Sequence, residues 1–139
     1  MAMTGPGWRT LATALLIVAA LAWLRDPPWL AGYRHGFFPV EVDAEGVAFQ
    51  WTAGRASFYV PADAAVPRSF HVAAHPQFPT QVSISVDGRL FDRFVVGPEW
   101  RKVAVPVAQA TTSRRHRRVD VHVAMAWGFH RQGVRLRFD

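Results

Sequence analysis

Beyond residue 46, apolar and polar residues alternate one by one in a series of short segments. A period of two is typical of β-strands that turn one face to a core and the other to solvent. Glycine- and proline-containing stretches separate the segments, and no helical period appears after residue 31. We therefore predict an all-β domain, a small antiparallel β-sandwich of about eight strands, with a closed barrel as the alternative. The strands are expected at residues 47–52, 55–60, 70–74, 82–86, 89–96, 103–107, 119–125 and 134–138.

Two dipeptides predict how neighbouring strands connect. Ala53-Gly54 separates the first two expected strands, so we expect a tight turn there. Asp87-Gly88 is followed directly by another apolar-rich segment. A type I′ hairpin turn needs positive φ at both central residues, and Asp followed by Gly is one of the pairs that adopt it. The second dipeptide therefore predicts a β-hairpin within residues 82–96.

The stretch from Leu11 to Leu24 is apolar and carries no charge. Arg9 precedes it, and Arg25 and Pro27-Pro28 follow it, where consecutive prolines cannot continue a helix. As a helix this stretch spans about 21 Å, which is short for a bilayer. Tryptophans near both ends suit an interfacial aromatic belt. We predict one N-terminal transmembrane helix, anchored by Trp8, Leu11, Leu15, Leu16, Ile17, Leu21, Trp23, Leu24 and Trp29.

A cleaved signal peptide is the alternative for this stretch, because it has a basic start, a short apolar core and an Ala-x-Ala at residues 20–22. The anchor is favoured because Leu24, Trp29 and Leu30 continue the apolar character beyond that point. We expect residues 1–31 to form the membrane anchor and a short linker, and residues 32–139 to form the extramembrane β-sandwich domain. The expected location is the bacterial inner membrane, with a cytoplasmic N-terminus and a periplasmic or extracellular β domain.

Three segments of the β region carry a resemblance to a known class of domains. They are the Gly-Phe-x-Pro-x-Glu stretch at residues 36–41, the Phe-Gln-Trp-Thr-Ala-Gly-Arg-Ala stretch at residues 49–56, and the Asp87-Gly88 hairpin. In this order, after a hydrophobic segment, they resemble the extramembrane β domains attached to some bacterial integral-membrane glycosyltransferase-like proteins. The resemblance covers the β domain only and implies an accessory sandwich without catalytic residues.

The chain is basic, with a formal net charge of +6, and Lys102 is its only lysine among sixteen basic residues. A GC-rich genome explains this bias as well as an acidic partner does. The most basic segment, called here the basic stretch, is expected to form an exposed turn before a strand. Lipid phosphate or an acidic protein surface suits it in a tethered domain, and a solvated charged loop is the plain alternative. The basic stretch consists of Arg114, Arg115, His116, Arg117 and Arg118.

No pattern of residue types points to catalysis or to nucleic-acid binding. The chain has no cysteine, no Gly-x-Ser-x-Gly and no glycine-rich phosphate loop. His71 and His75, and likewise Asp120 and His122, are close in sequence, but a metal site needs three or four converging ligands. Basic residues interleaved with exposed aromatics, as in nucleic-acid-binding surfaces, are not evident. We expect no catalytic residue, no metal or other cofactor, and no nucleic-acid partner.

Three tryptophans of the β region are candidates for stacking on a sugar ring. Trp51 and Trp127 occur in strand patterns, where large aromatic side chains are mostly buried. Trp100 stands beside Pro98 and Glu99 and is therefore the better candidate for ligand stacking.

These features favour a non-catalytic, single-pass accessory subunit of a larger bacterial membrane protein complex, of which respiratory and photosynthetic complexes are examples. Its partners are then membrane lipid and the other subunits of the complex, contacted through the helix and the β domain. The alternative is a membrane-tethered envelope module that binds glycan or another ligand. An exposed, coplanar Trp100 and a polar groove favour the second function, and an apolar or arginine-lined flat patch with buried tryptophans favours the first.

Overall fold

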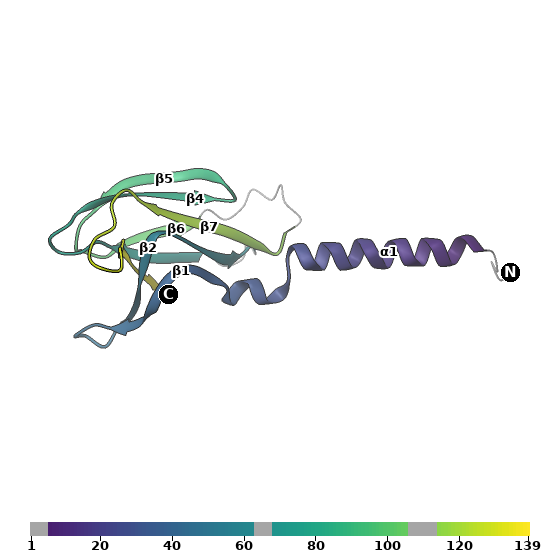
Figure 1. Ribbon diagram of the computed structural model, residues 1–139, viewed down its shortest axis with the longest axis horizontal. Helices are drawn as coiled ribbons and strands as arrows, with labels where there is room; N and C mark the ends of the chain where they lie inside the picture. Colours follow the sequence, from purple (N-terminus) through teal and green to yellow (C-terminus); the bar gives the residue numbers. More distant parts are fainter. Residues whose placement is uncertain (1–5, 63–67, 106–113) are drawn as a thin grey trace.

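The computed structural model describes residues 6–62, 68–105 and 114–139. It begins with helix α1 at Pro6–Arg25, followed by a short 3₁₀ helix, η1, at Pro28–Gly32. Figure 1 shows α1 projecting as a rod from one end of the β domain. Helix α1 ends just before the proline pair, as expected for residues that cannot donate a backbone hydrogen bond. The segment Gly7–Gly32 is long and apolar enough to cross a bilayer, a criterion that a signal sequence also meets.

Eight strands follow in the described part of the chain, and all their pairings are antiparallel. Their order in the sheet is β5-β4-β7-β2-β8-β3-β6, and β1 pairs with β2 outside this path. This architecture confirms the predicted all-β class with one N-terminal apolar helix. The strands are β1 Arg34–Val42, β2 Ala48–Pro61, β3 Arg68–Ala73, β4 Thr80–Val86, β5 Arg89–Val96, β6 Arg101–Val105, β7 His116–Val123 and β8 Arg135–Phe138.

Strand β2 is shared by two layers. Its first half pairs with β8 at Gln50 and Trp51, and its second half pairs with β7 from Arg55 to Pro61. One layer therefore continues through β7, β4 and β5, and the other through β8, β3 and β6. The end strands β5 and β6 are not paired with each other, so the described sheet is folded over into a sandwich and is not a closed barrel.

The core lies between the two layers. Alternate residues of β4 and β7 point into it from one side, and alternate residues of β3 and β6 from the other. Each fully buried aliphatic side chain stabilises the fold by about 1.5–3 kcal/mol relative to exposure. The principal core residues are Phe58, Phe70, Val72, Val82, Ile84, Phe94, Val103, Val105, Val119, Val121, Val123, Val134 and Leu136.

Two expectations from sequence are wrong. Ala53-Gly54 is not a turn, because β2 runs unbroken from Ala48 to Pro61. The two small residues instead lie where β2 changes its partner from β8 to β7, and glycine in a strand often marks such a bend. The second error is that no strand was expected where β1 lies. The pairing of β1 with β2 contains two irregularities, and Gly36 adopts a positive φ of 76°.

The predicted hairpin is confirmed. Asp87 has a φ of 50° and Gly88 a φ of 80°, the signs that a type I′ turn requires, and Val86 pairs with Arg89 across the turn. Strand β6 begins at Arg101, two residues before the expected strand at 103–107, and is described as far as Val105; Val107 lies outside the described residues.

Candidate functional site at the junction of helix and sandwich

Asp26, the first residue after α1, joins the helix to the sandwich. It is only 8% exposed. One carboxylate oxygen accepts a hydrogen bond from the Nδ1 of His116 at 2.7 Å, and the other accepts the backbone N–H of Arg115. Both donors lie at the start of β7. We call these three residues the Asp26 junction, and it ties the end of α1 directly to the β domain.

Aromatic residues surround the Asp26 junction. Trp23 at the end of α1 and Trp29 in η1 pack edge to face, with ring centroids 4.7 Å apart, and both stay about half exposed. The ring centroids of Tyr33, directly after η1, and Tyr59 of β2 lie 6.2 Å apart, so the aromatic contacts continue from η1 to the sheet. The chain between helix and sheet is therefore packed against the domain, although the sequence suggested only a short stiff linker there.

The basic stretch divides into two parts. Only Arg114 and Arg115 precede β7, and both side chains are exposed. No ion pair in the described part of the chain involves either side chain. The backbone carbonyl of Arg115 accepts the N–H of Ala62 at 2.8 Å, which holds this segment beside the end of β2. The expected exposed turn is therefore found for these two residues only.

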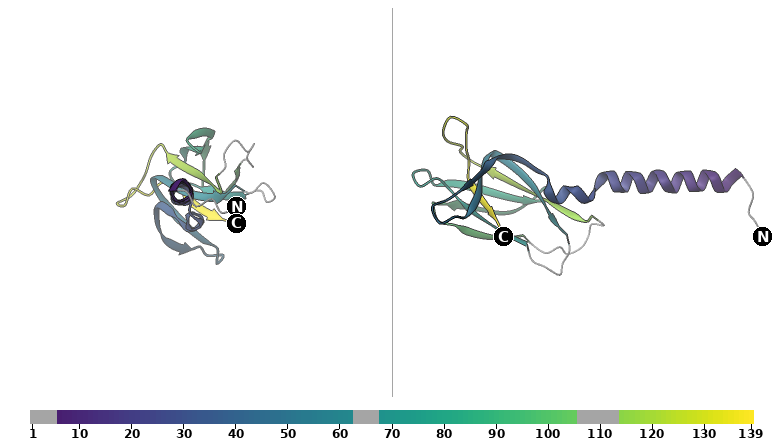
Figure 2. Two further views of the ribbon diagram at one scale, coloured as in Figure 1. Left: turned by 90° about the vertical axis from the view of Figure 1, so that its right-hand side faces the viewer. Right: turned by 90° about the horizontal axis from the view of Figure 1, so that it is seen from below.

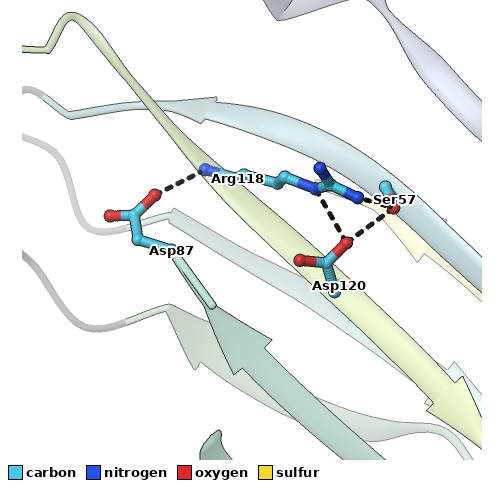
Figure 3. A network of polar contacts seen from close by, with 4 residues as sticks. All are labelled: Ser57, Asp87, Arg118 and Asp120. Atoms are coloured by element: carbon cyan, nitrogen blue, oxygen red, sulfur yellow. Dashed lines mark hydrogen bonds and ion pairs between the residues drawn. The ribbon is translucent and has the colours of Figure 1, made fainter. Parts of the chain in front are cut away.

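The rest of the basic stretch belongs to strand β7. Arg117 lies 3.8 Å from the carboxylate of Asp87, and its side chain is mostly buried. Arg118 donates to Asp120 Oδ1 at 2.9 Å and to Ser57 Oγ at 3.3 Å, while its backbone N–H donates to Asp87 Oδ1 at 3.0 Å (Figure 3). The hydroxyl of Ser57 also donates to Asp120 at 2.6 Å. Asp87, in the turn between β4 and β5, and Asp120, on the same strand as the arginines, thus neutralise this half of the basic stretch.

Trp100 does not present an open stacking surface. Its ring is half-buried and lies 5.0 Å from the guanidinium carbon of Arg135 and 5.1 Å from that of Arg137. The ring centroids of Phe49 and Trp51, both buried, lie 5.6 Å and 5.8 Å from the guanidinium carbon of Arg135. We call these five residues the arginine–aromatic face. It consists of an arginine-lined patch over a buried tryptophan.

Arg135 is held firmly within this face. Its Nη2 donates to the backbone carbonyl of Pro98 at 3.0 Å. Burial lowers the pKa of Arg135, and the negative charge of Asp43 partly offsets that effect. A guanidinium starts from so high a pKa that it stays charged at neutral pH. A permanent, partly desolvated positive charge is therefore stacked among aromatic rings.

The histidines are engaged in separate contacts. His71 Nδ1 lies 3.0 Å from the carboxylate of Asp139, and the rings of His75 and Trp127 are tilted against each other with their centroids 4.0 Å apart. Within residues 6–62, 68–105 and 114–139, no three His, Cys, Asp or Glu side chains come close enough to hold a metal ion. Two shallow grooves beside β2 have volumes of about 190 Å³ each, below the range of roughly 300–1,000 Å³ of usual ligand pockets.

No family model matches the chain, and no curated protein matches it. Among solved structures, CBM51-2 and INT domains from Clostridium perfringens ZmpB align with a TM-score of 0.44 and 10% identity over 72% of this chain and 24% of that one, so this chain spans about a quarter of its length. A family 35 carbohydrate binding module from Clostridium thermocellum aligns with a TM-score of 0.45 and 12% identity over 76% and 87% of the two chains.

A Paenibacillus sp. cycloisomaltooligosaccharide glucanotransferase aligns with a TM-score of 0.39 and 12% identity, over 77% of this chain and 17% of that one. These three similarities are weak and involve β-rich domains. None of the three is a domain attached to an integral-membrane glycosyltransferase-like protein, so the finer resemblance inferred from sequence finds no support among them.

Proposed function

We propose that this chain is a non-catalytic, single-pass accessory protein of the bacterial inner membrane that docks to a larger membrane protein complex. Helix α1 is the anchor, the N-terminus is cytoplasmic, and the sandwich stands on the periplasmic side. The observation that carries this proposal is the Asp26 junction. It makes the anchor and the sandwich one unit, so the domain is presented at a defined height and orientation above the bilayer.

A fixed orientation suits docking better than capture of a free ligand. A module that searches for a soluble ligand gains from a long flexible tether, whereas a subunit gains from a geometry that is already set before it meets its partner. Here the exposed residue Arg25 is followed at once by the buried Asp26, and the next strand starts at Arg34. Little chain remains for independent movement.

Two surfaces are available for docking. No residue of α1 from Gly7 to Arg25 is buried by the described residues, and small residues such as Ala12, Ala19 and Ala20 allow another helix to approach closely. On the sandwich, the connection between β7 and β8 projects from the domain, as Figure 2 shows in olive yellow. Phe129 in this connection is fully exposed.

The β7–β8 connection is well ordered by its own hydrogen bonds. Trp127 and Gln132 exchange two backbone hydrogen bonds of 2.7 Å, and the N–H of Arg131 donates to Gly128 at 3.2 Å. Trp127 packs 5.3 Å from Trp51 and anchors the base of the loop. An exposed aromatic side chain held on a rigid loop is typical of the residues that contribute most of the binding energy at protein interfaces.

The arginine–aromatic face adds to this support. A glycan platform needs an open aromatic ring, and the Trp100 ring instead contacts Arg135 and Arg137. Arginine and tryptophan together are enriched in protein–protein hot spots. This arrangement favours the accessory role over the envelope glycan- or ligand-binding module.

Photo-crosslinking in native membranes tests the proposal. Because the chain has one lysine, a genetically encoded benzophenone is a better probe than an amine-reactive reagent. We expect probes at Phe129 and at Leu16 in α1 to give adducts with subunits of one and the same complex, which also co-purifies in mild detergent. A probe at Leu90, an exposed residue of the edge strand β5, is the control.

A protein that migrates as a lone monomer in several mild detergents, with no adduct from either site, contradicts the accessory role. The envelope-binding module then becomes the better hypothesis, and binding of the purified protein to cell-wall glycans is the measurement that follows.

A further inference from the structure

Three exposed arginines lie together where the helix meets the sandwich. Arg25 is the last residue of α1, and Arg114 and Arg115 come immediately before β7. The Asp26 junction brings the two segments together, because Asp26 follows Arg25 in the chain and binds the backbone N–H of Arg115. The sequence separates Arg25 from Arg114 by most of the domain, so only the folded chain forms this cluster.

Among the described residues at this end, Asp26 and Asp87 are both already engaged. Asp26 is buried in its contacts with Arg115 and His116, and Asp87 accepts from the backbone of Arg118 and lies 3.8 Å from Arg117. No ion pair within the described ranges involves the side chains of Arg25, Arg114 or Arg115. The described residues at this end therefore present an excess of positive charge.

We infer that Arg25, Arg114 and Arg115 form a binding surface for the phosphate-bearing headgroups of anionic phospholipids in the bilayer that holds α1. We call these three residues the headgroup cluster. The inference rests on the proposed membrane anchoring of α1. It assigns the anionic partner expected for the basic stretch to lipid. It also limits the surface to the arginines that have no carboxylate partner within the described residues.

The position of the headgroup cluster along the helix supports lipid over an acidic protein. The apolar run of α1 ends at Leu24, and the exposed rings of Trp23 and Trp29 lie at the same level. Tryptophans at this point of a spanning helix occupy the headgroup region. Arginine side chains attached at that level extend along the interface and place their guanidinium groups among the phosphates.

Arg117 and Arg118 are excluded from the headgroup cluster for a structural reason. Arg118 is paired with Asp120 on the outer face of the β7 layer (Figure 3), and Arg117 faces Asp87. Both guanidinium groups are therefore already engaged with carboxylates of the chain. Their contribution to lipid binding is expected to be small.

The test uses the full chain in nanodiscs that contain equal amounts of phosphatidylglycerol and phosphatidylcholine. Native mass spectrometry of the released protein measures which lipid stays bound. Each arginine close to an anionic surface strengthens the attraction about fivefold. We expect phosphatidylglycerol to be enriched at least fivefold on the wild-type chain, and the enrichment to fall at 1 M ammonium acetate, where the Debye length is about 3 Å.

The decisive variant is Arg114→Glu/Arg115→Glu, which should abolish the enrichment. Its control is Arg55→Glu/Arg131→Glu, which changes the net charge equally at two exposed arginines away from the junction and should leave the enrichment unchanged. Because glutamates beside Asp26 can loosen the junction, Arg114→Gln/Arg115→Gln is measured as well. Each variant is compared only if its unfolding midpoint matches that of the wild type.

Equal retention of both lipids by the wild-type chain, or enrichment that survives in both Arg114/Arg115 variants, overturns the headgroup cluster while leaving the accessory role intact. Displacement of the lipid by millimolar inorganic phosphate identifies a general anion site and also overturns it. Loss of a co-purifying complex in the same variants, without any lipid preference in nanodiscs, assigns the surface to a protein. Failure of the chain to insert into nanodiscs at all overturns the membrane anchoring itself.

Discussion

The carboxylate of Asp26 and the imidazole of His116 are ninety residues apart in sequence and 2.7 Å apart in the structure. Both side chains are about nine-tenths buried. This contact joins the end of the apolar helix to the first residue of a central strand. The sequence suggests a domain on a tether, but in the structure the anchor and the sandwich share this polar contact. The proposed docking role depends on that contact.

Loss of Asp26 should therefore weaken the fold. Asp26→Ala leaves the buried Nδ1 of His116 and the N–H of Arg115 without their acceptor, which costs about 1–3 kcal/mol in the free energy of unfolding. Asp92→Ala, at an exposed carboxylate 3.7 Å from Arg101, is the control and should change it by less than about 0.5 kcal/mol. Denaturant unfolding of the full chain in detergent measures both, and equal effects of the two variants would contradict the role of the junction.

Two glycines with similar backbone angles should respond differently to substitution. Gly88 has a φ of 80°, and no atom lies within 4 Å of the place where a Cβ would stand, so Gly88→Ala adds only backbone strain of about 1 kcal/mol. At Gly36 the added Cβ would lie 2.1 Å from the backbone carbonyl oxygen of Arg55. Gly36→Ala should therefore destabilise the domain considerably more. A thermal melt in which both variants lose the same stability would argue against the close contact of β1 with β2.

Phe129→Ala should separate docking from folding. Because this side chain is fully exposed, its loss should change the free energy of unfolding by less than about 0.5 kcal/mol. Recovery of the partner complex with the purified chain should fall at least tenfold if Phe129 is an interface hot spot. Val95→Ala, at another exposed apolar side chain, is the matched control and should retain the complex. Undiminished recovery with Phe129→Ala would remove this loop from the interface.

Asp139 should titrate below its ordinary range. The hydroxyl of Ser69 donates to its carboxylate at 2.6 Å and lowers its pKa; partial burial acts in the opposite direction, and the charges of His71, Lys102 and Arg137 lower it further. Because the folded-state pKa is below the unfolded value, the stabilisation is complete above the unfolded pKa and is lost as pH falls through the folded pKa.

An NMR titration of the side-chain carboxyl carbon of Asp139 measures this pKa directly. Ser69→Ala should move its midpoint upward, toward the ordinary value of 3.8. Ser83→Ala, which removes a hydroxyl on another strand that contacts Arg93, should leave the midpoint in place. A midpoint that does not respond to Ser69→Ala would show that the hydroxyl contact does not control this carboxyl group.

Strand positions were largely predictable because alternation is a local property. Successive side chains of an extended backbone point to opposite faces. Val82, Ile84 and Val86, which alternate with serines in the sequence, therefore all face the core. The Asp87-Gly88 turn was predictable for a similar reason, since its backbone angles depend on those two residues alone. The bend at Ala53-Gly54 was not, because small residues fit both a turn and a bend within a strand, and only the pairing partners distinguish them.

The amino-acid sequence by itself determined the apolar helix, the β class, the hairpin and the concentration of arginine in residues 114–118, all of which follow from neighbouring residues. The tertiary structure alone decided which of those arginines are neutralised and which are exposed. Asp87 reaches Arg117 because β4 pairs with β7, and Asp26 reaches His116 although ninety residues separate them in sequence. Such contacts depend on register and on how the two layers fold over β2, and no spacing along the chain encodes them.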